Sequence, residues 1–264
     1  MNRSILAPIA LLLGVLASLS PLHAGAAEQV STANNDLLSG HPLDALARYR
    51  TLLSDPAYLK EGSPELWYNR GLAEEKTGDV AAASLSFRRA LLLDPGFAPA
   101  QHQLATVLAT LGLPVPKDWK LGVYAIVLPE RLMIVGSTIG WIGTLLLVVV
   151  IFHGPRKKGL ILLSLFLLIA GHGSAIFGSL IDPRRTAVDQ AVVIAKSAPT
   201  MRSTPADNGS PGGTLAPGSV ISVLSRNGAW WYVAAGPGQI GWIPSDTVTT
   251  LVPTAPSGAP AKGS

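Results

Sequence analysis

Two long apolar runs in the middle of the chain limit its fold more than any other feature. Residues 132–152 and 159–181 consist almost entirely of apolar and small side chains, and residues 153–158 join them. A bilayer core about 30 Å thick needs roughly 20 helical residues to cross it, and each run has about that length. The joining segment carries Gly154, Pro155 and consecutive basic residues, so it is too polar to stay in lipid. The sequence therefore predicts a two-helix transmembrane hairpin with both flanking segments on one side of the membrane.

The composition of the chain excludes several classes of function. The net charge is +4 and no dense Lys/Arg run is present, which indicates membrane-flanking charge and no nucleic-acid partner. The chain has no cysteine, so disulfides, thiolate metal sites and cysteine nucleophiles are excluded. It also has no phosphate-binding loop and no G-x-S-x-G motif, and its histidines lack a metal-ligating spacing. We therefore expect neither an enzyme nor a bound metal or cofactor.

The N-terminal residues indicate export. Residues 1–26 have a basic start at Arg3, an apolar stretch, and an A-x-A-like cleavage site at Ala24 and Ala26, which are the parts of a signal peptide. An uncleaved N-terminal anchor is the alternative, and either one would export the segment that follows. The basic loop of the hairpin would then remain in the cytoplasm, in agreement with the positive-inside rule.

Residues 27–112 are predicted to form short helical pairs, most clearly between residues 64 and 95. Small residues occur where paired helices would cross closely, aromatic residues would fill the space between layers, and a proline ends the unit. The residues at these positions are Trp67, Gly71, Gly78, Ala83, Phe87, Ala90 and Pro95. Their spacing resembles that of a tetratricopeptide repeat. The unit departs from the pattern at Arg70 and Glu74, where Leu and Tyr are usual, which predicts looser packing or a surface that faces a partner.

A weaker unit precedes this repeat, and a single helix at residues 100–111 follows it as a cap. The weaker unit has Gly40, Ala45, Tyr49 and Leu52 at similar offsets. Two repeats and a cap are fewer than the roughly three repeats that a self-sufficient stack needs. We therefore expect the domain to lean on a partner, on a second copy or on the membrane surface.

The concave face of such a stack is lined by the first helix of each repeat, which makes it a candidate peptide groove. The residues predicted there are Glu65, Tyr68, Asn69, Leu72 and His102. In this repeat family, the position of Asn69 often bonds the backbone of a bound peptide. The alternative is that these residues are ordinary solvated helix positions.

Residues 113–131 form a proline-bounded connector that contains Trp119 and Tyr124. Amphipathic aromatic residues just outside a span favour the headgroup layer, so we interpret the connector as an interfacial collar. A loop or short strand of the repeat domain is the alternative.

Small residues and one histidine stand out inside the hairpin. Gly136-x-x-x-Gly140 and Gly171-x-x-x-Ala175 allow close helix approach, either within the hairpin, which we favour, or with another protein. His172 lies well inside a span, and an intramembrane ionisable group suggests a function by default. Because no charged partner accompanies it, we favour a neutral histidine bonded to a backbone carbonyl or a threonine.

Alternating patterns replace the helical period after residue 185. Residues 191–195, 220–224, 230–234 and 240–243 predict short strands separated by Gly, Pro and Asn turns. Met201-Arg202-Ser203 stands where bacterial SH3 domains carry a V-R-S stretch, and residues 186–251 resemble such a domain as a whole. The Asn and Gly that usually bracket that stretch are missing, which puts the first loop in doubt. The Pro/Ala/Gly/Ser-rich tail, residues 252–264, is expected to be disordered.

Three tryptophans are the candidate ligand-binding residues of this domain. Trp230 and Trp231 are adjacent, so on a strand they face opposite sides of the sheet. One is expected in the core, and the other, with Trp242, would line a groove for Pro-rich or glycan-peptide ligands. The alternative is that all three are core and rim of the barrel.

The predicted fold is thus a multidomain membrane protein with α-helical tetratricopeptide repeats, a transmembrane hairpin and an all-β SH3-like barrel. This domain order resembles the BatE-type proteins of bacterial aerotolerance operons. The resemblance implies a bacterial inner-membrane protein with both soluble domains in the periplasm. It also implies an assembly with von Willebrand-domain membrane proteins and a MoxR-like AAA+ ATPase, linked to oxidative or envelope stress. It provides no catalytic residue to carry over.

Two functions follow as hypotheses from this organisation. The first is a membrane scaffold that uses both soluble domains for protein–protein interaction. The second is a cell-wall sensor that binds peptidoglycan through the SH3-like domain. An enzyme or transporter centred on His172 has little support, because two helices with one unpaired histidine make a poor path for a solute.

Overall fold

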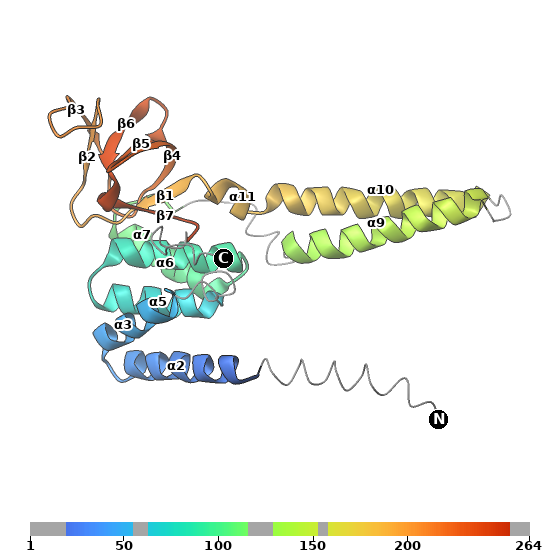
Figure 1. The fold of residues 1–264 in the computed structure, drawn as a ribbon, viewed down its shortest axis with the longest axis horizontal. Coiled ribbons are helices and arrows are strands. Elements are labelled where there is room, and N and C mark those ends of the chain that lie inside the picture. Colours follow the sequence, from blue (N-terminus) through green and yellow to red (C-terminus); the bar gives the residue numbers. More distant parts are fainter. Residues whose placement is uncertain (1–19, 55–62, 116–128, 153–157, 254–264) are drawn as a thin grey trace, which may run out of the picture.

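The computed structural model describes residues 20–54, 63–115, 129–152 and 158–253, with side chains from residue 28 onward. Most of the predicted signal segment, most of the connector, nearly all of the polar loop and almost the whole tail therefore lie outside the described residues. The described chain has three parts, which are a stack of helices, a long helical hairpin and a small β-domain (Figure 1).

The helical stack, which we define as residues 20–115, consists of short antiparallel helices. They are α2 (Ser20–Leu38), α3 (Pro42–Leu52), α5 (Pro64–Lys76), α6 (Val80–Leu93) and α7 (Ala98–Thr110). Gly40, Gly78 and Gly112 follow α2, α5 and α7 with φ of +81°, +81° and +68°, a conformation that favours glycine. The same turn therefore recurs three times along the stack.

Side chains at the repeat positions pack as the spacing predicted. Trp67 and Phe87 are almost completely buried, Trp67 in a cluster with residues of α2 and α3 and Phe87 in a cluster with residues of α7. A Cβ atom on Gly71 would lie 2.6 Å from Cε1 of Phe87, so only glycine allows the two helices to approach this closely. In the weaker unit, Ala45 and Tyr49 are fully buried where α3 packs on α2. Both predicted helix pairs are present.

The two departures from the repeat pattern form an ion pair whose carboxylate is buried. Arg70 Nε lies 2.9 Å from Glu74 Oε1, and Ser86 Oγ donates a hydrogen bond of 2.6 Å to Glu74 Oε2. Glu74 is only 1% exposed. The expectation of a partner-facing surface is therefore wrong for Glu74, whose carboxylate is matched inside the stack.

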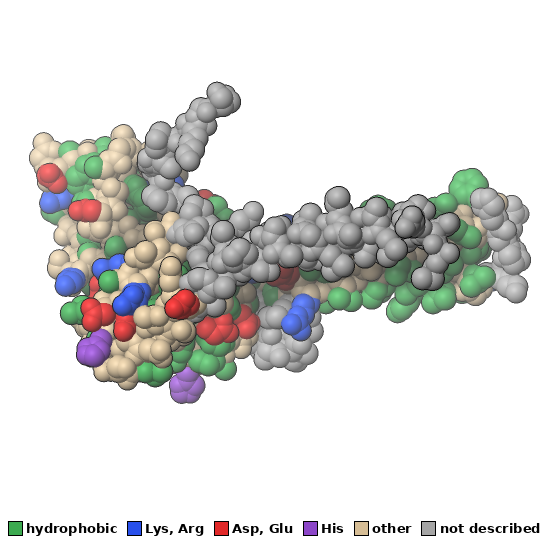
Figure 2. Space-filling view, turned by 60° about the horizontal axis from the view of Figure 1, so that its bottom comes forward, with side chains coloured by type: hydrophobic (Ala, Val, Ile, Leu, Met, Phe, Trp, Pro, Cys, Tyr) green, Lys and Arg blue, Asp and Glu red, His purple; other side chains and the backbone are tan. Residues whose placement is uncertain are grey.

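The hairpin consists of α9 (Pro129–Phe152) and α10 (Lys158–Ile181), which extend together away from the other two parts (Figure 1). Both helices are long and apolar enough to cross a membrane, as predicted. Hydrophobic side chains follow the visible edge of the hairpin in Figure 2. The start of α9 and the end of α10 lie at the same end of the hairpin, so both soluble parts leave it there.

Small residues form the seam between α9 and α10. A Cβ atom on Gly136 would lie 2.8 Å from Gly171 O and 2.9 Å from Ala175 N. A Cβ atom on Gly171 would lie 2.6 Å from Gly140 Cα. These residues therefore pack within the hairpin, which is the interpretation that the sequence favoured.

The β-domain, residues 190–251, is an antiparallel sheet with strand order β3-β2-β6-β5-β4-β1-β7. The strands are β1 (Gln190–Val193), β2 (Thr200–Arg202), β3 (Pro211–Thr214), β4 (Val220–Asn227), β5 (Trp230–Gly236), β6 (Gln239–Pro244) and β7 (Val248–Thr250). The four predicted apolar runs correspond to β1, β4, β5 and β6. Ile221, Val233 and Ile243 from three neighbouring strands are buried in the core.

The β-domain packs directly on the helical stack. Leu85 of α6 forms an apolar cluster with Ala187, Val192 and Leu251. Ala187 is the last residue of the short helix α11 (Arg184–Ala187), which links α10 to β1. We expected the helical stack to need support from outside its own repeats, and the structure shows that it packs on another part of its own chain.

Arg89 of α6 fixes this junction with two hydrogen bonds. Its Nε donates to Leu251 O at 3.1 Å, and its Nη2 donates to Thr250 O at 2.8 Å. The guanidinium carbon lies 4.7 Å from the centre of the Trp67 ring, and Arg89 as a whole is 7% exposed. Burial, and then repulsion from Arg70, lower the pKa of Arg89 to about 9. The charge is thus costly to bury, and the hydrogen bonds and ring contact offset that cost.

Candidate functional site

Aromatic side chains gather on the outer face of the β-domain, where β5 and β6 pair. Tyr232 lies opposite Trp242, with ring centroids 5.0 Å apart, and Trp230 lies opposite Pro244. Paired residues project to the same side of a sheet, and residues two apart along a strand share that side. We call Trp230, Tyr232, Trp242 and Pro244 the aromatic face. Each of these residues is partly exposed.

Trp231 lies on the opposite side of β5 and packs against the core of the β-domain. Arg226, its partner on β4, covers the ring, with its guanidinium carbon 4.7 Å from the ring centre. The two adjacent tryptophans therefore lie on opposite sides of the sheet. Trp231 belongs to the core, and Trp230 joins Trp242 on the outer face.

The aromatic face borders a cation. Arg202 of β2 lies opposite Trp242, and its Nη1 donates to Gly209 O at 3.1 Å. Flat aromatic rings beside a guanidinium suit apolar, proline-rich or sugar-containing ligands that also carry an acceptor. The face offers binding contacts and contains no nucleophile beside a general base.

Of the residues predicted to line a groove in the helical stack, some pack inside the stack and others are exposed to solvent. Tyr68 contacts the rings of Phe87 and Phe97, with centroids 5.7 Å and 5.5 Å away. Leu72 also packs against the core of the stack. Glu65 and His102 are exposed.

Asn69 is already bonded to another helix of the stack. Its Nδ2 donates to Oδ1 of Asn34 at 3.0 Å, and the same oxygen accepts the hydroxyl of Tyr49 at 2.7 Å. Burial, and then the nearby carboxylate of Asp36, raise the pKa of Tyr49 to about 12. A peptide that bonded Asn69 would have to displace Asn34 on α2.

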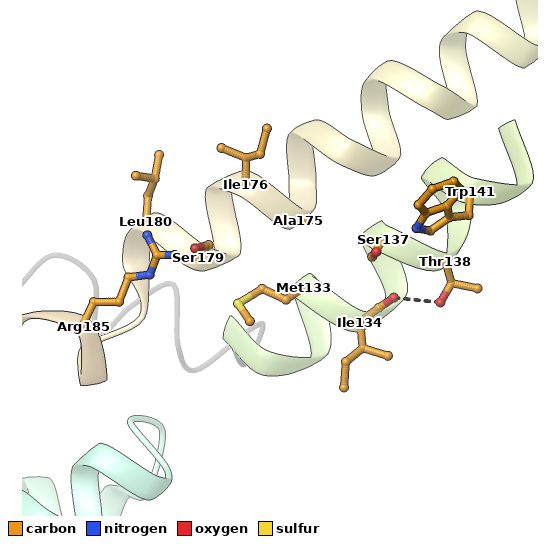
Figure 3. A pocket seen from close by; sticks show the side chains of 10 residues that line it. All are labelled: Met133, Ile134, Ser137, Thr138, Trp141, Ala175, Ile176, Ser179, Leu180 and Arg185. Carbon is orange, nitrogen blue, oxygen red and sulfur yellow. Dashed lines mark hydrogen bonds between the residues drawn. The ribbon is translucent and has the colours of Figure 1, made fainter. Parts of the chain in front are cut away.

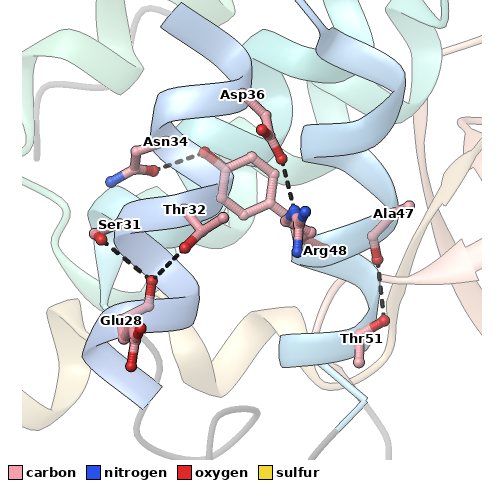
Figure 4. A network of polar contacts seen from close by, with 9 residues as sticks. Glu28, Ser31, Thr32, Asn34, Asp36, Ala47, Arg48 and Thr51 are labelled. Atoms are coloured by element: carbon pink, nitrogen blue, oxygen red, sulfur yellow. Dashed lines mark hydrogen bonds and ion pairs between the residues drawn. The ribbon is translucent and has the colours of Figure 1, made fainter. Parts of the chain in front are cut away.

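Further polar contacts of α2 and α3 lie around Asn34 (Figure 4). Arg48 Nε lies 2.6 Å from Asp36 Oδ2, and this exposed ion pair joins the two helices. A shallow hollow of about 550 Å³ next to it is also lined by Gln29 and Asp44. These contacts tie the first helix pair together, and we assign no ligand to the hollow.

His172 is accounted for by packing inside the hairpin. Its Nδ1 lies 3.0 Å from Leu168 O, which is the bond to a backbone carbonyl that the sequence favoured. The ring fills the space beside Gly140 and meets the ring of Trp141 edge-on, with centroids 6.1 Å apart.

A broad hollow of about 830 Å³ lies along the hairpin near its junction with the soluble parts (Figure 3). Its walls include Ser137, Trp141, Ala175 and Arg185. It opens on a side of the hairpin where Ile134, Trp141 and Ile176 are exposed, and we assign no ligand to it. No group of three or more His, Cys, Asp or Glu side chains in the described ranges is placed to hold a metal.

Comparisons with protein-family models, with curated proteins and with solved structures gave no match. The functional argument therefore depends on the geometry of this chain.

Sequence reasoning missed several residues of the aromatic face and the junction. Tyr232 and Pro244 share strand parity with Trp230 and Trp242, so a strict two-residue period would have found them. Arg89 gave no such signal, because its acceptors lie more than 160 residues away along the chain.

Proposed function

We propose that the chain is an inner-membrane scaffold whose two soluble parts act together as one periplasmic recognition unit. In this proposal the helical stack is a tetratricopeptide repeat domain and the β-domain is an SH3-like domain. The observation that carries it is the junction, where Arg89 and the cluster around Leu85 dock the two parts against each other. A partner that contacts both parts would meet surfaces already held in one orientation, which lowers the entropy cost of binding.

The resemblance to BatE-type proteins suggests which partners to test. They are von Willebrand-domain membrane proteins and a MoxR-like AAA+ ATPase, in an assembly for aerotolerance or envelope stress. The proposal assigns no catalytic residue, metal or cofactor to this chain. Its binding residues are those of the aromatic face.

The test is recovery of partners on the tagged full-length protein from membranes solubilised in mild detergent, followed by mass spectrometry. Trp242→Ala should reduce recovery about tenfold or more, because aromatic anchors carry a large share of binding energy. Leu224→Ala is the matched control, since Leu224 is an exposed apolar residue of the neighbouring strand β4. Equal recovery with both variants would remove the aromatic face from the proposal.

Point variants are a sharper tool here than removal of a whole domain. Deletion of either soluble part would expose Leu85 or Leu251, which are buried at the junction. Loss of partners after such a deletion would then reflect unfolding as readily as loss of a binding surface.

A cell-wall sensor is the second candidate, and the paired rings of Tyr232 and Trp242 favour it. Such rings offer flat faces for the sugars of peptidoglycan. The purified full-length protein should then co-sediment with purified cell wall, and Trp242→Ala should abolish this. Wall binding without recovery of any protein partner would replace the scaffold by the sensor.

A further inference from the structure

A cavity of about 270 Å³ lies between the helical stack and the β-domain side of the molecule. Leu104 and Leu108 of α7 form part of the wall from the stack. Ala187 of α11 and Leu251, next to β7, form part of the opposite wall. Anything bound in the cavity would therefore touch both soluble parts.

Arg88 of α6 supplies the charge in this cavity. Its Nε is buried and has no hydrogen-bond partner, and no other buried side-chain nitrogen or oxygen in the described part of the chain lacks one. None of the ion pairs among the described residues includes Arg88. Burial lowers the pKa of Arg88 to about 10. The adjacent Arg89 differs, because both of its bonding nitrogens reach backbone carbonyls.

A buried donor without a partner is unusual in a folded protein and points to a missing ligand or ion. The wall has three other polar side chains, Gln101, Thr186 and Gln190, and the first two are already satisfied. Gln101 Nε2 donates to Pro95 O at 2.7 Å, and Thr186 Oγ1 donates to Pro183 O at 3.1 Å. The cavity thus offers one free cationic donor, together with the neutral amide of Gln190, among mostly apolar walls.

This chemistry selects among anionic ligands. A peptide would bring several backbone N–H and C=O groups, and most of them would be left without partners against these walls. A single-chain carboxylate has one polar end, which matches one guanidinium. At about 30 Å³ for each water-sized group, the cavity holds roughly nine such groups, enough for a carboxylate of about eight carbons.

We propose that this cavity binds a single-chain carboxylate such as a medium-chain fatty acid, with the carboxylate on Arg88 and the chain against Leu104, Leu108 and Leu251. The position of the cavity agrees with such a ligand. Pro183, two residues beyond the end of α10, is part of its wall, so it lies close to the membrane surface where amphiphiles concentrate. Because the ligand contacts both soluble parts, its binding stabilises their docking.

The experiment uses the purified full-length protein in a non-ionic detergent, with octanoate as the probe. Thermal unfolding should shift upward with octanoate concentration, and native mass spectrometry should show one octanoate per chain. Octanol and octyltrimethylammonium, which carry the same chain without the negative charge, should give neither effect.

Arg88→Met tests the charge and should weaken octanoate binding at least tenfold. Without ligand, this variant should unfold at the same temperature as the wild type or higher, because it removes a buried unpaired charge. Loss of binding therefore cannot be attributed to misfolding. Arg50→Met is the matched control on the exposed side of α3 and should bind octanoate as the wild type does. Ala105→Leu, which fills the cavity without changing its charge, should also weaken binding.

Two outcomes would overturn the proposal. One is equal octanoate binding by the wild type and Arg88→Met. The other is stabilisation by a short peptide with an apolar C-terminal residue but not by octanoate, which would make the cavity a peptide site.

Discussion

The seam of the hairpin and the junction between the soluble parts are both closely packed, but by opposite chemistry. In the seam, Gly136, Gly140 and Gly171 bring backbone against backbone. At the junction, the long side chain of Arg89 reaches from α6 to the carbonyls of Thr250 and Leu251. The seam depends on glycines that have no side chain, whereas the junction depends on one long side chain, that of Arg89.

The composition of each region agrees with this difference. Both hairpin helices are long and apolar enough to cross a membrane, and helices in lipid gain from close packing and little from burial of apolar surface. At the junction, burial of Leu85 and Leu251 away from water supplies the driving force. Strand ends there leave carbonyls that need donors, and Arg89 provides them. Each contact should therefore fail for a different kind of substitution.

The largest effect is expected for Gly171→Ala in the hairpin. The added Cβ would lie 2.6 Å from Gly140 Cα and 2.7 Å from Gly136 O, and backbone atoms cannot move aside as side chains do. We expect a loss of about 3 kcal/mol or more in the free energy of unfolding, at the upper end of overpacking effects. Thermal unfolding in detergent measures it. Gly173→Ala is the control, because nothing lies within 4 Å of a Cβ there, and an equal loss in both variants would contradict the backbone seam.

The next largest effect is expected for Arg89→Met at the junction. This change keeps much of the side-chain length but leaves two buried carbonyls without their donors, at a cost of about 2 kcal/mol. Limited proteolysis should then cleave the chain near α11 faster, because the β-domain separates more often from the stack. Arg50→Met on exposed α3 should leave proteolysis unchanged. Unchanged cleavage in Arg89→Met would show that the apolar cluster alone maintains the junction.

A smaller effect is expected where a glycine of the seam faces a side chain and not backbone atoms. A Cβ atom on Gly140 would collide with the ring of His172, which is a side chain. Gly140→Ala should therefore destabilise the hairpin by about 1–3 kcal/mol, and His172→Ala in the same chain should restore much of that loss. The double-mutant cycle in detergent measures the coupling. Strictly additive losses would mean that the collision is relieved elsewhere, and loss of partner recovery in a stable His172→Ala would give that residue a function beyond packing.

Local patterns in the sequence were enough to predict the helical stack, the hairpin and the presence of a β-domain. The apolar runs gave the hairpin, the spacing of Trp67, Gly71 and Phe87 gave a helix pair, and alternation gave four strands. These signals come from residues close in the chain, where period and spacing translate directly into geometry. The strands β2, β3 and β7 were not predicted, because they have three or four residues each and too little alternation to stand out.

Contacts between distant residues could not be predicted in the same way. Arg88 and Arg89 are adjacent in the sequence, yet Arg89 donates to two carbonyl acceptors, whereas the Nε of Arg88 has no acceptor. Only the docking of the β-domain on α6 makes that difference. The pairing of Arg70 with Glu74 is the exception, since a four-residue helical spacing already favours an ion pair. That signal was available in the sequence, whereas our prediction for these two residues was looser packing or a surface that faces a partner.

The smallest effect is expected for Tyr49. Its hydroxyl makes a neutral hydrogen bond inside the stack, whereas Arg89 makes charged hydrogen bonds at the junction. Tyr49→Phe removes the bond to Asn34 and should cost about 1 kcal/mol at pH 7. The pKa of about 12 in the folded protein lies above the ordinary value of 10, so the unfolded chain releases the proton first. The free energy of unfolding should fall as the pH rises from 10 towards 12. Tyr49→Phe should lack the part of this fall that comes from ionisation of the Tyr49 hydroxyl. Urea unfolding at pH 8, 10 and 11 measures this difference. Asn34→Ala should lower stability at pH 8 but retain the alkaline fall, and an identical pH profile for wild type and Tyr49→Phe would contradict the buried hydroxyl.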